Sequence, residues 1–138
     1  MTADIPAPSQ AQGQSQTETP EDVRDLKPAV INGLRLRCPK CGQGKLLHSY
    51  VKVNDHCSAC QQPFHHQRAD DGPAYLTILI VGHLMGFALH IAWVQWRPEP
   101  WVLATTMSVV AIVGALVLLP RMKGLMIAYQ WAKRMHGF

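Results

Sequence analysis

The chain has 138 residues, which leaves room for one small domain, and its mean hydropathy near zero averages a polar N-terminal region with an almost uncharged stretch over residues 74–120. Residues 1–30 contain five acids and two bases, so the remaining 108 residues carry eleven bases against four acids, a formal charge of +7. This excess suits an anionic membrane surface, whereas the bases are too scattered to form the single stripe typical of nucleic-acid-binding proteins.

Residues 1–30 are predicted to form a disordered tail. They are rich in Gln, Ser, Thr, Pro and Ala and lack the periodic apolar residues that offset the loss of chain entropy on folding. They also lack the basic start, apolar stretch and small-residue cleavage site of a signal peptide. The first membrane-directed element is therefore expected inside the chain.

Residues 31–68 contain all four cysteines, in two Cys-x-x-Cys pairs with fifteen residues between the pairs. This spacing is typical of one tetrahedral metal site, because each short turn directs two thiolates at the same ion. Gly42 follows the first pair and is expected to adopt a left-handed conformation, a place that Gln61 takes after the second pair. The predicted metal ligands are Cys38, Cys41, Cys57 and Cys60.

The segment between the pairs predicts a β structure. Residues 46–53 have β-branched and aromatic content and precede Asn54 and Asp55, a pattern typical of a strand that ends in a turn. The module is therefore predicted to be a small zinc-ribbon-like hairpin. Zn²⁺ is the expected ion, although the spacing leaves rubredoxin-like iron open. A closed four-sulfur site has no position for a substrate, so we expect a structural role and no catalysis.

A redox-active pair and structural disulfides are the alternatives to a metal site for the four cysteines. A thioredoxin-like redox pair expects a surrounding βαβ pattern that the sequence lacks, and structural disulfides are disfavoured in the cytosol. Four thiolates around Zn²⁺ leave a charge of −2, which nearby bases would offset. These bases are Arg35, Arg37, Lys40 and Lys45.

Residues 69–120 are predicted to form a transmembrane hairpin. Residues 74–96 contain no Asp, Glu, Lys or Arg, and an α-helix of this length, at ~1.5 Å per residue, spans the ~30 Å hydrocarbon core. Residues 101–119 form a second uncharged run, and the intervening Arg-Pro-Glu-Pro of residues 97–100 predicts a reversal at a membrane surface. A soluble helical pair is the alternative, but the rest of the chain is too small to cover two helices that are apolar all round.

The bases that flank the spans predict a bacterial inner-membrane protein with both termini in the cytosol. Arg97 is the only base in the turn, whereas five bases lie on the other side. Residues 121–138 place apolar side chains on one helical face and are predicted to form an interfacial amphipathic helix, or to pack on a partner. The five flanking bases are Arg68, Arg121, Lys123, Lys133 and Arg134.

His83 and His90 lie seven residues apart in the first span, on one helical face with Gly86 and near Gly82. Polar groups at this depth need partners, and the spacing of the two glycines allows close helix approach. We therefore expect interhelical hydrogen bonds. Haem or copper ligation is the alternative, but the second span offers no histidine to complete such a site.

Four motifs follow one another in a fixed order, and this order is more specific than any one of them. The chain has Arg-Cys-Pro-Lys-Cys-Gly-Gln-Gly at residues 37–44, then the second cysteine pair, and then Ala-Asp-Asp-Gly-Pro-Ala at residues 69–74. The two spans follow and end in Leu-Pro-Arg-Met-Lys-Gly at residues 119–124. This combination resembles the bacterial family catalogued as domain of unknown function 983, over about residues 34–130. The resemblance implies a small membrane protein without an established activity. It also implies a link to cytochrome c oxidase, because members in related bacteria tend to be encoded beside the oxidase and its assembly factors.

Together these features predict a noncatalytic accessory or assembly factor of a respiratory membrane complex, with the bilayer and a membrane protein complex, such as cytochrome c oxidase or its assembly factors, as partners. Two alternatives remain. A membrane-tethered zinc-ribbon regulator would bind nucleic acid, which is not expected here, and would need clustered bases and exposed aromatic platforms. A metal- or redox-handling enzyme would need a labile metal or a reactive thiolate.

Overall fold

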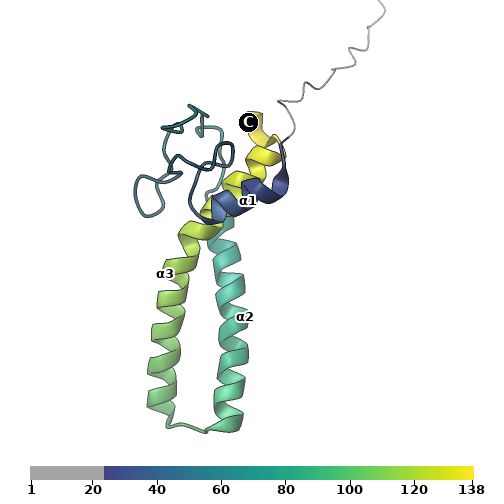
Figure 1. Ribbon diagram of the computed structural model, residues 1–138. Coiled ribbons are helices and arrows are strands. Elements are labelled where there is room, and N and C mark those ends of the chain that lie inside the picture. The colour runs from purple at the N-terminus through teal and green to yellow at the C-terminus, as the bar shows by residue number, and fades with distance from the viewer. Residues whose placement is uncertain (1–23) are drawn as a thin grey trace, which may run out of the picture.

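The computed structural model describes residues 24–138 of the chain, and this part contains three α-helices. They are α1 (Leu26–Leu34), α2 (Gly72–Gln95) and α3 (Pro100–Ala132), followed by the short 3-10 helix η2 (Met135–Gly137). Figure 1 shows α2 and α3 side by side as a hairpin, with α1, the loop-rich segment and the C-terminus all at the end opposite the turn. Both ends of the described chain therefore lie on the same side of the hairpin.

The helices α2 and α3 correspond to the two predicted spans, and both are long and apolar enough to cross a membrane. α2 has Pro73 in its first turn, where the missing N–H costs no hydrogen bond. No residue in the most apolar part of α3 is buried within the protein. The helices are thus not the covered core of a soluble protein, and their exposed apolar side chains suit a lipid environment.

The helix α3 continues through Pro120, so the separate amphipathic helix expected over residues 121–138 is instead an extension of the second span. Proline has no N–H, which leaves the carbonyl of Leu116 without its helical donor. The hydroxyl of Tyr50 donates to that carbonyl from outside the helix. Beyond Pro120 the apolar face of α3 is buried by other parts of the chain, as shown by Ile127 and Trp131.

The helix α1 covers this extension of α3. Most of α1 falls in residues 1–30, which were expected to form a disordered tail. Residues 1–23 of that tail lie outside the described residues. Gly33 and Gly124 meet at the crossing, where a Cβ on either would collide with the other's backbone carbonyl. Arg24 adds a hydrogen bond of 2.9 Å to the carbonyl of Trp131 and lies over its ring. Small residues and this long-range contact therefore hold α1 on α3, although most of α1 was expected to belong to the disordered tail.

The end of α1 directs the chain into the cysteine module. The N–H of Leu36 donates to the carbonyl of Gly33 (2.9 Å) and the N–H of Arg37 donates to that of Asn32 (2.8 Å), the two bonds of a Schellman motif. Leu36 occupies the left-handed position of this motif with φ 60°, where glycine is usual. Because the turn is tight, Cys38 follows directly beside α1 and α3.

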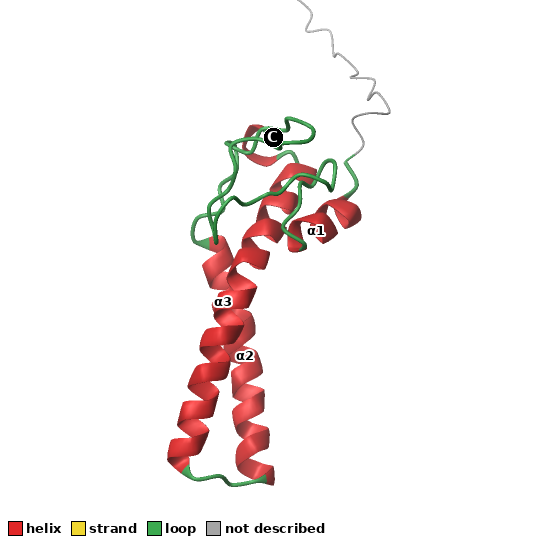
Figure 2. Ribbon diagram, turned by 60° about the vertical axis from the view of Figure 1, so that its left-hand side comes forward, coloured by secondary structure: helices red, strands yellow, loops and turns green. Residues whose placement is uncertain are grey.

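The module of residues 35–71 contains no strand, so the predicted zinc-ribbon-like hairpin is not confirmed. The described residues hold three isolated β-bridges, one of which, Leu47 to Val53, lies at the expected strand. Figure 2 shows the module as loop throughout, over the extended end of α3. The buried cluster that joins the module to α3 consists of Cys38, Leu46, Cys57, Phe64, Ala69 and Ile127.

Candidate metal centre

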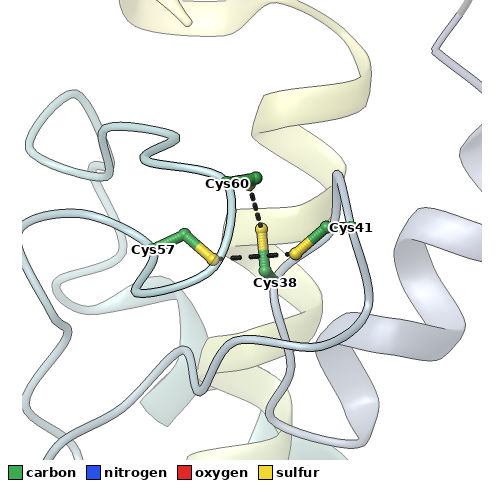
Figure 3. Close-up of side chains that lie close together, drawn as sticks. All are labelled: Cys38, Cys41, Cys57 and Cys60. Carbon is green, nitrogen blue, oxygen red and sulfur yellow. Dashed lines mark hydrogen bonds between the residues drawn. The ribbon is translucent and has the colours of Figure 1, made fainter.

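The structure brings the four predicted cysteines together, with every Sγ atom within 4.8 Å of the others. The sulfurs of Cys38 and Cys60 are 3.7 Å apart, as are those of Cys41 and Cys57, so each close contact joins one pair to the other (Figure 3). In a tetrahedral site with metal–sulfur bonds of about 2.3 Å, neighbouring sulfurs are about 3.8 Å apart. The cluster therefore fits a metal ion bound by four thiolates, and its spacing suits zinc and iron equally.

The two Cys-x-x-Cys turns have the same backbone. The carbonyl of Cys38 accepts a hydrogen bond from Gly42 (2.9 Å), and that of Cys57 accepts one from Gln61 (3.0 Å). Gly42 is left-handed as predicted, with φ 69°, and Gln61 adopts φ 57° at the equivalent position. A left-handed conformation is unfavourable by about 1–2 kcal/mol for a residue with a side chain. Gln61 adopts it in the second turn, at the position that Gly42 occupies in the first.

The thiols do not titrate alike. Burial raises the pKa of Cys38 and of Cys60, since a thiolate loses hydration inside the protein. Burial also raises the pKa of Cys41, but the backbone N–H groups of Gly44 and Gln43 and the two neighbouring thiols bring it down to about 6. Protein groups alone therefore favour a mixture of thiol and thiolate, and a bound cation would supply the missing stabilisation of four thiolates.

The packing around the sulfurs leaves little free space. Cys38 and Cys57 are fully buried, and Phe64 and Leu46 beside them are fully buried as well. A Cβ at Gly44 would collide with the Sγ of Cys57. The four bases predicted to offset the charge of the site are all exposed, so they act from the surface of the module.

A glutamine that sequence analysis missed holds the module on α3. Gln130 is 4% exposed, and its Oε1 accepts a hydrogen bond from the N–H of Arg68 (2.9 Å) while its Nε2 donates to the carbonyl of Arg68 (2.7 Å). These two bonds fix the linker between the second cysteine pair and α2. The available signal was a glutamine among apolar residues of the 122–131 segment, but nothing in the sequence indicates its partner.

The histidines of the first span do not form the predicted interhelical hydrogen bonds. The Nδ1 atom of His83 lies 2.7 Å from the carbonyl of Leu79 in its own helix. A Cβ at Gly82 or Gly86 would meet no atom within 4 Å, because α3 packs along another side of α2. Among the described residues, the side chains brought together at metal-binding distance are the four cysteines, and neither His83 nor His90 is near them.

The sequence of the chain resembles one described family. A family model described as "Protein of unknown function (DUF983)" matches residues 47–131. The match begins between the two cysteine pairs, includes both long helices and ends at Trp131, near the C-terminal end of α3. No curated protein and no solved structure matches the chain.

Proposed function

This chain belongs to the DUF983 family, and from that membership we propose that it is a noncatalytic accessory or assembly factor of a respiratory membrane complex of the cytochrome c oxidase type. The observation that carries the proposal is the four-cysteine cluster held at the end of a hairpin whose apolar faces are uncovered. The cluster and Gln130 fix a module beside the membrane, and the hairpin leaves α2 and α3 free to contact lipid or another membrane protein.

The four cysteines support a structural metal, which we propose to be Zn²⁺. Four protein sulfurs complete a tetrahedral shell and leave no position for a substrate, as in structural zinc sites. The ion would hold the two Cys-x-x-Cys turns together, with Cys38 and Cys57 on its buried side and Cys41 and Cys60 partly exposed. This bridge would add to the buried cluster around Leu46 and Phe64 that already joins the two halves of the module.

We place the protein in the bacterial inner membrane with both termini in the cytosol, since five bases flank the spans on the side of the termini and Arg97 stands alone in the turn. A phosphatase that is active only in the periplasm should be active when fused within residues 97–100 and inactive when fused after Phe138. The opposite pattern would contradict the orientation and reopen the disulfide interpretation of the cysteines.

The respiratory role is supported by the resemblance to this family, because family members in related bacteria tend to be encoded beside cytochrome c oxidase. Deleting the gene is expected to lower the amount of assembled oxidase in the membrane at unchanged transcript levels. The wild-type chain should restore the oxidase, and Cys38→Ser should not. The measurement is oxidase activity together with the abundance of its subunits.

The matched control is the double variant His83→Gln, His90→Gln, which changes two exposed polar side chains of α2 and leaves the module intact. Glutamine keeps a hydrogen-bonding group at each position, so oxidase levels should return to normal. A normal oxidase level in the deletion strain would contradict the proposed function. A double variant that accumulates normally but lacks oxidase activity would contradict a merely structural role for the two histidines.

A further inference from the structure

We propose that the surface between the cysteine module and α3 binds the headgroup of an anionic phospholipid. Two adjoining hollows open on this surface and share Arg35, Leu36 and Arg37 in their linings. We name the joined hollow the basic groove. The lining residues on which the argument depends are Arg35, Arg37, Lys45, Tyr50, Pro120 and Arg121.

The charge of the basic groove favours an anion. Its four cations, Arg35, Arg37, Lys45 and Arg121, are exposed, and no acidic residue of the described chain lines either hollow. Arg37 donates to the carbonyl of Gly42 (3.4 Å) and Arg121 to that of Val117 (2.7 Å), both through a single guanidinium nitrogen. A guanidinium has five N–H donors, so each retains donors for the paired oxygens of a phosphate.

The depth of the basic groove matches the headgroup layer. Arg121 directly follows the uncharged run of residues 101–119 and Pro120, and its side chain turns back toward Val117. The hydroxyl of Tyr50 donates to the carbonyl of Leu116 from the module. Leu116 precedes Arg121 in α3, so at ~1.5 Å per residue it lies about 7.5 Å from Arg121 along the helix, toward the uncharged run. The groove thus has cations at its outer end and an aromatic ring and a proline at its inner end.

The inner end distinguishes a lipid from a free phosphate. Leu116 and Val117, on the neighbouring surface of α3, are 54% and 50% exposed and lead from the groove onto the apolar face of the span. A soluble phosphate would use the cations and leave this apolar surface unpaired. A phospholipid would place its phosphate among the cations and its acyl chains along α3, so the groove fits both parts of one molecule.

The test uses the full chain with its metal, purified in neutral detergent and titrated with phosphatidylglycerol or phosphatidylcholine while bound lipid is counted by native mass spectrometry. The wild type should retain phosphatidylglycerol in preference to phosphatidylcholine. Arg35→Gln, Arg37→Gln, Arg121→Gln together should weaken phosphatidylglycerol binding at least about tenfold, since each base near an anionic lipid surface contributes roughly fivefold.

The control variant Lys27→Gln, Arg68→Gln, Lys133→Gln removes the same charge from exposed positions outside the groove and should bind phosphatidylglycerol like the wild type. Equal weakening in both triple variants would overturn the proposal, because net charge alone would then explain binding. Displacement of the lipid by inorganic phosphate at matched concentration would overturn it as well, in favour of a free-phosphate site.

Arg37 also lies near the metal site, so metal content is measured in every variant. If the groove variant loses metal, Arg121→Gln alone replaces it, because Arg121 belongs to α3 and lies outside the module. That variant should keep its metal and bind phosphatidylglycerol roughly fivefold more weakly. Unchanged affinity would overturn the proposal. These outcomes do not depend on oxidase assembly, so the lipid site and the proposed function can fail separately.

Discussion

Replacing Cys38 with serine is expected to abolish stoichiometric metal binding and to unfold the module of residues 35–71, while α2 and α3 remain helical. Serine provides no thiolate, and metal binding to four-ligand sites of this kind contributes about 10–16 kcal/mol to folding. Without the ion, the module keeps only a small buried core around Leu46 and Phe64. Elemental analysis of zinc and iron per chain, together with protease cleavage inside the module, measures both effects.

The control for this experiment is Lys52→Gln, which changes an exposed residue between the two cysteine pairs without removing a sulfur. It should keep about one metal ion per chain and resist protease like the wild type. A wild-type protein with less than about half an equivalent of zinc plus iron would argue against a permanent site. A serine variant with full metal content would show that the four sulfurs do not act together.

Replacing Gly124 with leucine is expected to detach α1 from α3. The position faces Gly33 so closely that even a Cβ would collide with its carbonyl, and Leu36 lies on the other flank. Overpacking of this kind costs about 1–3 kcal/mol, which raises the detached fraction of α1 roughly five- to a hundredfold. Limited trypsin digestion should therefore cleave the variant faster after Arg35, which directly follows α1.

Gly114→Leu is the matched control, because it makes the same change in the same helix where a Cβ would meet no atom within 4 Å. This variant should be digested at the wild-type rate. Equal rates for Gly124→Leu and Gly114→Leu would contradict the close crossing of α1 and α3. Faster digestion in both would point to a general effect of leucine on the hairpin.

The parts of the structure that depend on local composition were predictable from the sequence. Two runs without charged residues gave the long helices, and the two Cys-x-x-Cys pairs gave the four sulfurs that come together. The left-handed turn at Gly42 also followed from residue type. Each of these features depends on neighbours within a few residues or on a single physical limit such as membrane thickness.

The parts that depend on distant contacts were not predictable. α1 has only nine residues, too few for a stable helix in isolation, and it is ordered by α3. The continuation of α3 past Pro120 depends on Tyr50, which supplies the hydrogen bond that proline removes. The β-branched content of residues 46–53 indicated a strand, which is not confirmed, because the described residues show there the isolated bridge of Leu47 with Val53 and no ladder.

The crossing of α1 over α3 also determines the order in which the protein can mature. The hydrogen bond from Arg24 to the carbonyl of Trp131 joins residues 107 positions apart, and both long helices lie between them or include one of them. At about 5–20 residues per second, translation needs several seconds to pass from one partner to the other. The cysteine cluster takes its ligands from residues 38–60 and can close on an ion during that interval. Attachment of α1 and the cysteine module to α3 must therefore wait until residues 122–131, which both of them contact, have been synthesised near the end of the chain.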